Sequence, residues 1–320
     1  MPVPQRFALS LDLVDLDHQE PDRNRRESKY YWDELFRLVP ATGFRAVEIP
    51  CQPKWDFGGR SGVPFTPYAI ETKYGTADAF RKALAAGGIE RVAGVVFSPA
   101  MFAGAPGDAY FGAFQHFGGM AVRFAASLGA EVLTISPTPP IGLLEHHRGD
   151  ASAWEADFLA KTADVVGALA AQAAAAGVKV ALKDEYWSLL RGERIDAFAE
   201  RLGAAVSLDV DTAHAAIAGL DPTARIRALG ARVGAVHLTD TSFADTASHW
   251  RAVRPELPAG RATQVFRDLG QGGVDLAAAC RALDGVGYAG PVVVSCRQTR
   301  DVFRAMLRSR AHIDGVLAKA

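Results

Sequence analysis

The chain has 320 residues, of which 49% are hydrophobic and 22% are charged. This composition is typical of a globular protein and excludes a disordered one, and the length allows one large domain or two ordinary ones. The formal net charge of −1 gives no overall field that would attract nucleic acid or an anionic membrane surface.

The cysteines and the apolar segments indicate a reducing, aqueous location. Cys51, Cys280 and Cys296 are odd in number and widely separated, which fits free thiols better than a disulfide framework. Asp12 and Asp15 interrupt the apolar stretch near the N-terminus, so this stretch lacks the form of a signal peptide. No run approaches the roughly 18 apolar residues of a membrane-spanning helix. We therefore expect a cytoplasmic protein that does not enter a membrane.

Short runs rich in β-branched residues alternate with helical patterns along the chain. Eight runs predict strands, at residues 6–13, 44–50, 91–98, 131–137, 178–185, 205–211, 233–240 and 290–298. Helical patterns lie between them at 76–88, 153–176, 195–202, 222–229, 275–283 and 302–317. A β–α unit repeated eight times predicts parallel strands, and at this length a single (β/α)₈ TIM barrel over residues 1–320. A doubly wound open sheet is the alternative, but no G-x-G-x-x-G turn follows the first strand.

Two connections are longer than the rest of this pattern requires. They cover residues 51–73 and 241–264, and both contain aromatic residues and prolines. Loops of this length without a helix or strand pattern are often lids over a functional site. We expect both to lie over the C-terminal rim of the barrel, beside His237.

Polar residues gather at the predicted C-terminal ends of the strands, where TIM barrels carry their active sites. Asp209 and Asp211 lie two apart in "SLDVD", so both side chains should point to the same face of a strand. Other strand ends contribute Glu48, Lys183, Glu185, His214, His237, Asp240, Ser295, Arg297 and Gln298. Converging carboxylates and imidazoles are typical ligands of Zn²⁺, and Mn²⁺ or Mg²⁺ would accept them too. Inward charges on adjacent strands would otherwise repel one another or stay unsatisfied.

Each of these residues also has a purely structural explanation when taken singly. Asp209 could cap the next helix or make a buried hydrogen bond, and His237 could be a core histidine. Cys51 and Cys296 are expected to be small buried residues. Because several such groups come together, their combination favours a functional site.

The order of the motifs resembles that of a known family. The segments "LDVDTAHAAIAGLDP", "VGAVHLTDT" and "DLGQGGVDLAAACRALDGVGYAGPVVVS" resemble the xylose-isomerase-like barrel superfamily of sugar isomerases, epimerases and related lyases. The resemblance is strong in the second half of the chain and rests on the β–α rhythm in the first. It implies a divalent metal held by Glu, Asp, His and Glu at strand ends. Asp211 matches the family Asp, His214 its substrate-contacting His, and His237 its metal-binding His.

Both family glutamate positions differ in this chain, which has Lys183 after "GVKVAL" and Ser295 after "GPVVV". Lys183 would repel a cation if charged, or could act as a base if burial lowered its pKa. We expect one divalent ion, Mn²⁺, Mg²⁺, Zn²⁺ or Co²⁺, bound by Glu185, Asp211, His237 and Gln298. A second outcome stays open, in which the Lys183 ammonium takes the place of the metal, paired with Asp211 and Glu185.

The resemblance implies an isomerase or epimerase acting on a carbohydrate or polyol by proton abstraction next to a carbonyl. Glu185 is the candidate base, and the metal, or Lys183 with His214, would stabilise the enediolate. Candidate substrate-binding residues are Glu48, Trp187, Arg191, Arg251 and Arg297. Two alternatives remain: a lyase or dehydratase on a keto-sugar or cyclitol, and a barrel without catalysis that serves as a binding or partner subunit. The chain could also form a homo-oligomer.

Overall fold

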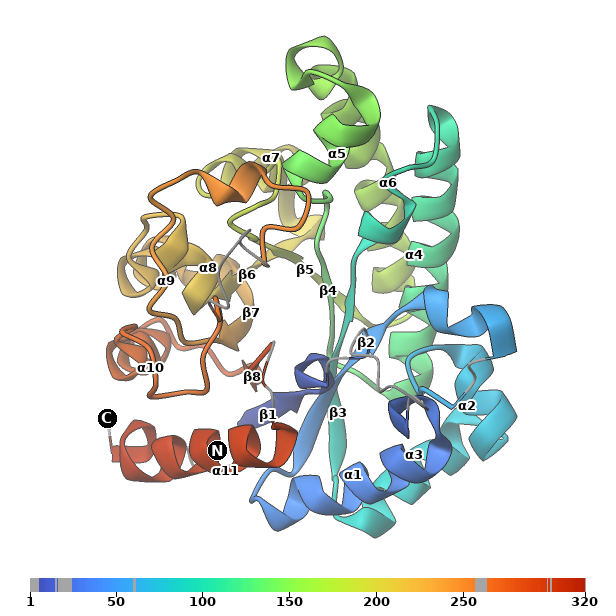
Figure 1. Cartoon of the computed structure of the whole chain (residues 1–320), viewed down its shortest axis with the longest axis vertical. Helices are drawn as coiled ribbons and strands as arrows, with labels where there is room; N and C mark the ends of the chain where they lie inside the picture. The colour runs from blue at the N-terminus through green and yellow to red at the C-terminus, as the bar shows by residue number, and fades with distance from the viewer. Residues whose placement is uncertain are drawn as a thin grey trace.

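Eight parallel strands close into a barrel in the computed structural model, which describes residues 6–14, 16, 25–59, 62–256, 264–297, 299 and 301–319 (Figure 1). The strands are β1 (Phe7–Ser10), β2 (Ala46–Cys51), β3 (Arg91–Phe97), β4 (Val132–Ile135), β5 (Lys179–Lys183), β6 (Ser207–Asp211), β7 (Val233–Leu238) and β8 (Val292–Val294). Neighbours in sequence are neighbours in the barrel, and β1 also pairs with β8. The predicted TIM barrel and its eight strands are therefore confirmed.

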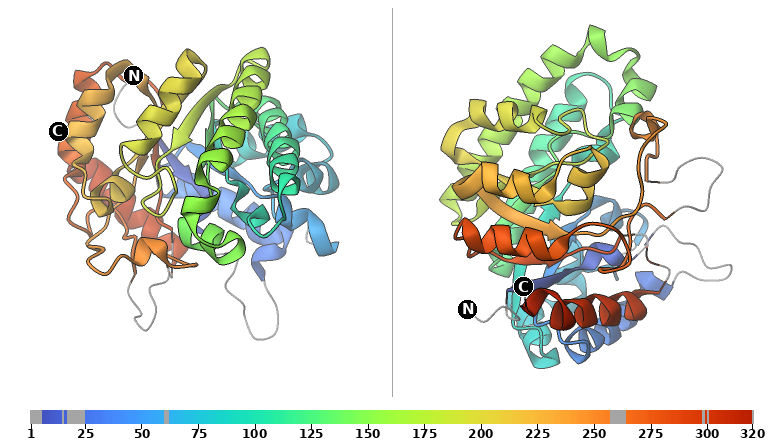
Figure 2. Two further views of the ribbon diagram at one scale, coloured as in Figure 1. Left: turned by 90° about the horizontal axis from the view of Figure 1, so that it is seen from above. Right: turned by 90° about the vertical axis from the view of Figure 1, so that its left-hand side faces the viewer.

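Helices surround the strands on the outside of the barrel (Figure 2). In the described part of the chain they are α1 (Lys29–Ala41), α2 (Pro67–Tyr74), α3 (Ala77–Gly87), α4 (Asp108–Leu128), α5 (Ile141–Arg148), α6 (Glu155–Ala175), α7 (Arg194–Leu202), α8 (Thr212–Ile217), α9 (Pro222–Leu229), α10 (Leu276–Gly285) and α11 (Val302–Gly315). Helix α3 begins and ends where its sequence predicts. Thr76 Oγ1 accepts the Ala79 N–H at 3.0 Å, and Gly88 ends the helix at a φ of +99°.

The interior of the barrel changes from small apolar to charged residues along the strands. At the N-terminal end, Ala8, Ala46, Ala93 and Val293 form one buried cluster, and Val132, Ala181 and Ala235 form another. Side chains alternate along a strand, so the residue two positions later faces the same way. Two positions beyond the alanines of β1, β2, β5 and β7 come Ser10, Glu48, Lys183 and His237, all buried. The strand period thus places a polar layer directly above an alanine layer.

The first long connection contains more regular structure than the sequence predicts. Helix α2 occupies the last part of the expected loop of residues 51–73 and ends one residue beyond it, and a 3₁₀ helix covers Pro53–Gly59. The signal was present in the sequence, because Thr66 caps α2 by accepting the Ala69 N–H and Pro67 is its first residue. In the described part of the second connection, only a single 3₁₀ turn, His249–Arg251, occurs.

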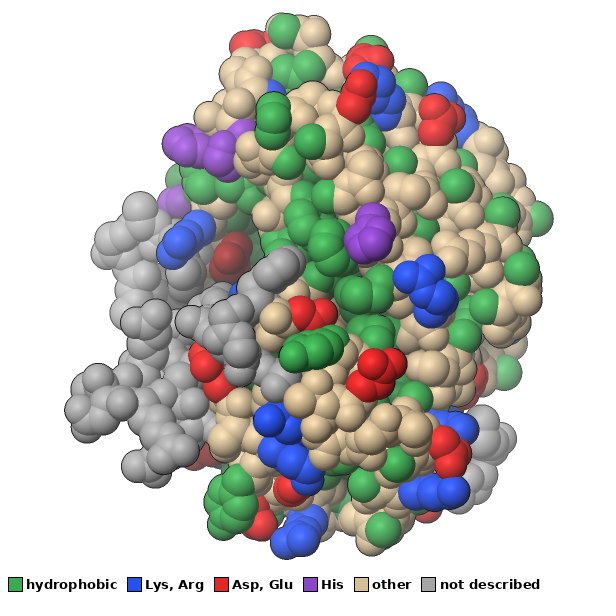
Figure 3. All heavy atoms as spheres, turned by 90° about the vertical axis from the view of Figure 1, so that its right-hand side faces the viewer, with side chains coloured by type: hydrophobic (Ala, Val, Ile, Leu, Met, Phe, Trp, Pro, Cys, Tyr) green, Lys and Arg blue, Asp and Glu red, His purple; other side chains and the backbone are tan. Residues whose placement is uncertain are grey.

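Acidic and basic side chains are interspersed on the side of the molecule drawn in Figure 3. This distribution agrees with the net charge of −1. No helix in the described ranges is long and apolar enough to span a bilayer.

Candidate functional site

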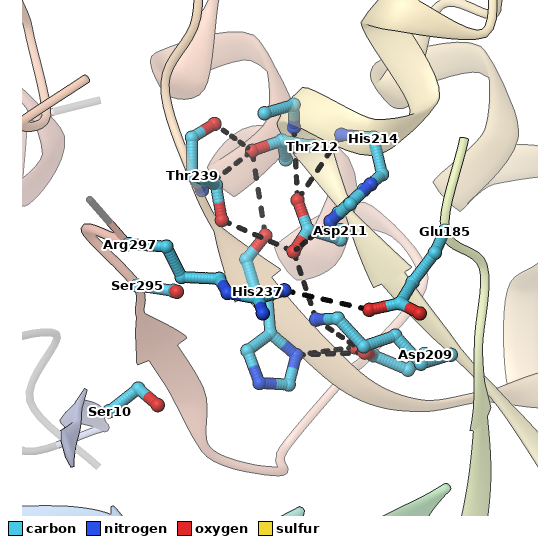
Figure 4. Close-up of polar contacts among 12 residues, drawn as sticks. Ser10, Glu185, Asp209, Asp211, Thr212, His214, His237, Thr239, Ser295 and Arg297 are labelled. Atoms are coloured by element: carbon cyan, nitrogen blue, oxygen red, sulfur yellow. Dashed lines mark hydrogen bonds and ion pairs between the residues drawn. The ribbon is translucent and has the colours of Figure 1, made fainter. Parts of the chain in front are cut away.

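A chain of buried side chains with alternating charge crosses the C-terminal end of the barrel (Figure 4). His237 Nε2 lies 3.0 Å from both carboxylate oxygens of Glu48, and its Nδ1 lies 2.8 Å from Asp209 Oδ2. Lys183 Nζ lies 3.4 Å from Asp209 Oδ2 and 2.9 Å from Asp211 Oδ2. All five residues are at most 5% exposed. Each cation therefore contacts two carboxylates, as buried charges require.

The carboxylates keep both cations of this chain protonated. Burial alone would lower the pKa of His237, but the charges of Asp209 and Glu48 outweigh it and raise this pKa to about 10. Burial opposes the charge of Lys183 as well, and Asp211 with Asp209 raises its pKa above the ordinary lysine value. Lys183 consequently does not fit the role of a neutral base that the sequence left open. It is a fixed positive charge.

His214 lies in an aromatic pocket beside this chain and is neutral. Its ring centroid is 4.7 Å from that of Trp187 and 5.1 Å from that of Phe266. Burial lowers the pKa of His214 to about 3. The backbone N–H of Tyr186 donates to Nδ1 at 3.2 Å, so the neutral ring carries its proton on Nε2. This buried Nε2 has no hydrogen-bond partner among the described residues and lies 3.9 Å from Asp211 Oδ2.

Glu185 lies near Lys183, but its closest contacts are with other groups. Trp187 Nε1 donates to Glu185 Oε2 at 3.1 Å, and Arg297 Nη1 lies 3.6 Å from Oε1. Burial raises the pKa of Glu185, although the charges of Arg297 and Lys183 oppose the rise. The predicted ion pair between Lys183 and Glu185 does not form. Lys183 is instead satisfied by the two aspartates of β6, which point to the same face of that strand.

A cavity of about 240 Å³ opens above the charged layer. Its polar lining includes Asp12, Gln52, Lys54, Lys183, Glu185 and Arg297. Arg297 contacts two acidic groups of this lining through different nitrogens, with its Nε 3.7 Å from Asp12 Oδ2 and its Nη1 3.6 Å from Glu185 Oε1. The cavity has the size and polarity for a small hydrophilic molecule rather than a macromolecular segment.

The predicted metal ligands are not gathered around one point. In the described part of the chain, no group of three or more His, Cys, Asp or Glu side chains is arranged to hold a metal ion. Asp211 is engaged by Lys183, and both nitrogens of His237 face carboxylates, so neither nitrogen offers a free lone pair. Glu185 is engaged by Trp187 and Arg297, and Gln298 lies outside the described residues. The donors present therefore do not fit a resident metal ion.

The predicted substrate-binding residues divide into two groups. Arg297 lines the cavity, Trp187 contacts Glu185, and Glu48 lies in the charged layer. Arg191 and Arg251 do not line the cavity. Their guanidinium carbons lie 3.7 and 5.2 Å from the ring centroid of Trp250, and Arg251 Nη2 pairs with Glu145 Oε1 at 2.5 Å. These two arginines hold the second long connection against its surroundings.

Two acidic residues have larger roles than the sequence assigned to them. Asp209 joins Lys183 to His237, and Asp12 accepts a hydrogen bond from Ser295 Oγ at 3.1 Å. Asp12 lies in the 3₁₀ turn Leu11–Leu13 that directly follows β1, so its place just beyond a strand end was the available signal. Cys51 and Cys296 are buried free thiols, as expected, and Cys280 is a buried free thiol as well.

Comparison with known proteins assigns this sequence to a family. The sequence matches the model of the xylose isomerase-like TIM barrel over residues 36–313. Among solved structures, D-psicose 3-epimerase from Clostridium cellulolyticum H10, determined with D-tagatose, is 14% identical with a TM-score of 0.69 and covers 98% of this chain and 99% of its own. The 3-keto-D-glucoside 4-epimerase YcjR from E. coli is 14% identical with a TM-score of 0.67, over 97% and 99% of the two chains. The IolI protein with a bound zinc atom is 16% identical with a TM-score of 0.65, over 98% of each chain.

At these identities the structural likeness establishes the fold. No protein with a curated description matches the sequence. Since the family model spans most of the chain, this protein belongs to the xylose isomerase-like TIM barrel family.

Proposed function

We propose that this protein is a sugar isomerase or epimerase that moves a proton at a carbon next to a carbonyl group. One observation carries the proposal. Glu185 is a buried carboxylate with a raised pKa that lines a small polar cavity beside two cations, Lys183 and Arg297. A carboxylate in such surroundings is a stronger base than one in water once it is ionised. The sugar epimerases among the structural neighbours support this interpretation of the site.

The lining of the cavity suits a hydroxylated substrate. Gln52, Ser98 and Ser136 offer uncharged donors and acceptors, while Lys54 and Arg297 offer cationic donors. A carbohydrate or polyol can satisfy these groups with its hydroxyls. Trp187, which holds Glu185 through its indole N–H, fixes the direction of the carboxylate. Arg191 and Arg251 act on the second long connection and have no part in this substrate contact.

In the proposed reaction Glu185 removes the proton from the carbon beside the carbonyl group. Negative charge then develops on the carbonyl oxygen, and Lys183 and Arg297 stabilise it as fixed cations of the cavity wall. His214 is neutral and its Nε2–H has no partner among the described residues, but it is not among the residues that line the cavity, so we assign it no direct contact with the substrate.

Asp12 is the second proton-transfer group in this proposal. Inverting a carbon centre requires that a proton be removed from one side and returned to the other. Asp12 lines the same cavity as Glu185, and Arg297 contacts both carboxylates. The Asp12 side chain is 20% exposed, so solvent can supply the proton that Asp12 then delivers to the carbon on the side opposite Glu185.

Deuterium exchange tests the proposal across several classes of sugar at once. The protein is incubated in D₂O with a panel of ketoses, ketose phosphates and keto-glycosides, and NMR detects deuterium at the carbon beside the carbonyl. We expect exchange in at least one sugar and its loss in Glu185→Gln. Glu131→Gln is the matched control, because Glu131 is exposed at the opposite end of the barrel, where it pairs with Arg91.

Two results would contradict the proposal. A dehydrated product in place of an isomer would assign the protein to the lyases. Sugar binding without exchange in any member of the panel would favour a binding subunit.

A further inference from the structure

The charged layer of the barrel already contains a cation at the place where carboxylates converge. Strand register pairs Lys183 with Asp209 and Asp211 with His237, so three neighbouring strands direct these side chains to one point. The ammonium of Lys183 contacts an oxygen of each aspartate, at 2.9 and 3.4 Å. We propose that the Lys183 ammonium is the resident cation of this site and excludes a divalent metal ion from it.

Repulsion between the cation already present and an added one is the first argument. Glu48, Asp209 and Asp211 bring three negative charges into the layer, and His237 and Lys183 bring two positive ones, all of them buried. A divalent ion bound to the same aspartate oxygens would lie within a few ångströms of the ammonium. Because water does not screen this position, the repulsion would expel one of the two cations. The lysine is covalently attached, so the metal is the one excluded.

The state of His237 is the second argument. A histidine binds a metal through a nitrogen lone pair, and its other nitrogen usually donates to an oxygen. Here both nitrogens lie within 3.0 Å of carboxylate oxygens, from Asp209 on one side and Glu48 on the other. Both must donate, so this ring has no lone pair to offer. Metal binding would require His237 to lose a proton and one of its two ion pairs.

The tethered cation retains the ability to act on a ligand. An ammonium group has three N–H donors, and the two aspartates accept two of them. Lys183 also lines the cavity, so the third N–H is available to an oxygen of a bound molecule. Only the part that Lys183 plays in the reaction rests on the proposed function. The exclusion of metal rests on the geometry alone.

Metal titration of the protein and its lysine variants tests this inference. Wild type, Lys183→Glu and Lys183→Met are each dialysed against Mn²⁺, Co²⁺ or Zn²⁺, and bound metal is counted by elemental analysis. We expect no stoichiometric metal and no shift of Tm in wild type. Lys183→Glu should bind about one ion per chain and gain thermal stability with metal, because a carboxylate then joins Asp211. Adding Asp211→Asn should abolish this binding.

Lys179→Glu is the matched control, since Lys179 lies on the same strand but is exposed at its opposite end. It should bind no more metal than wild type. If Lys183→Glu does not fold, Lys183→Met provides the same comparison, because it removes the ammonium and leaves the two aspartates uncompensated. Stoichiometric metal in wild type that Asp211→Asn removes would overturn the inference. A folded Lys183 variant that binds no more metal than wild type would overturn it as well.

The titration uses no substrate, which separates this inference from the proposed function. A metal-free wild type that exchanges no sugar proton would sustain the inference and refute the function. Stoichiometric metal in a wild type that exchanges sugar protons would refute the inference and support the function.

Discussion

The imidazole of His237 reaches across the barrel interior from β7 to the carboxylate of Glu48 on β2, at 3.0 Å from both of its oxygens. Asp209 binds the opposite side of the ring through Nδ1 at 2.8 Å. Ser10 on β1 also donates to Glu48, at 2.9 Å. One protonated histidine thus links the polar layer of several strands, and this arrangement has consequences for stability.

Replacement of His237 by Gln should strongly destabilise the fold. The substitution leaves Glu48 and Asp209 buried without their cation, and breaking a buried ion pair in this way typically costs about 3–5 kcal/mol. Urea unfolding measures the change. His146→Gln is the control, because His146 is exposed on α5 and its replacement should change stability by less than about 0.5 kcal/mol. Equal losses in the two variants would mean that the ion pairs of His237 contribute no net stability.

The stability of the wild type should fall as the pH rises from 6.5 to 10. The pKa of His237 is about 10 in the folded protein, above its ordinary value of 6.5. The folded state therefore binds a proton that the unfolded state releases in this range, and the stabilisation is complete only below pH 6.5. Urea midpoints at several pH values test the expectation. The slope should be shallower in His237→Gln, and an unchanged slope would show that His237 is not its source.

The pH dependence of the proposed reaction should report the ionisation of Glu185. The base must be ionised, so kcat/KM should rise with pH through the raised pKa of Glu185. Arg297 lowers this pKa, so Arg297→Met should move the acid limb of the profile to higher pH. Arg304→Met, an exposed substitution on α11, should leave the limb in place. Loss of Glu185 itself should reduce the rate by about 10²- to 10⁴-fold.

Asp12→Asn should separate the two halves of the proposed reaction. Glu185 could still remove the proton and exchange it with solvent, whereas the return of a proton from the other side would be lost. Deuterium incorporation into the substrate should therefore persist while formation of the epimer falls sharply, as NMR of the same reaction mixture would reveal. Loss of both signals together would place Asp12 in binding rather than in proton return.

The sequence predicted the fold and the inward direction of most site residues because both follow from simple periods. The β–α repeat identified all eight strands, and the two-residue period placed Lys183, Glu185, Asp209 and Asp211 on the interior face. Which cation pairs with which carboxylate could not be predicted in the same way. The answer depends on the stagger between strands, including a shift in the β6–β7 register between Leu208 and Asp209, and on side-chain reach.

Residues outside the strand ends were harder to assign. Arg191 and Arg251 are as suitable for binding an anionic ligand as Arg297, and no local pattern distinguishes them. Their contacts with Trp250 depend on how the chain folds within residues 241–256. Tertiary contacts of this kind cannot be predicted from the short sequence repeats of strands and helices.

The docking of the second connection depends on a glycine, and its replacement gives a test of the lid prediction. A Cβ on Gly142 in α5 would lie 2.1 Å from the backbone oxygen of Arg251 and 2.4 Å from that of Ala252. Backbone cannot yield as a flexible side chain does, so Gly142→Ala should push residues 249–252 away from α5. The hydrogen bond from Tyr186 Oη to Pro255 O at 3.0 Å links the same segment to the residue that holds His214.

We therefore expect Gly142→Ala to reduce sugar turnover and to increase proteolytic cleavage within residues 241–256, while urea unfolding changes little. Lids belong to the least stable parts of a fold, so displacing one should not unfold the barrel. Gly112→Ala is the matched control, because Gly112 also lies in a helix, α4, and a Cβ there meets nothing within 4 Å. It should be neutral or slightly stabilising. If Gly142→Ala lowered stability and activity in parallel, the segment would be a structural part of the barrel and not a lid over its cavity.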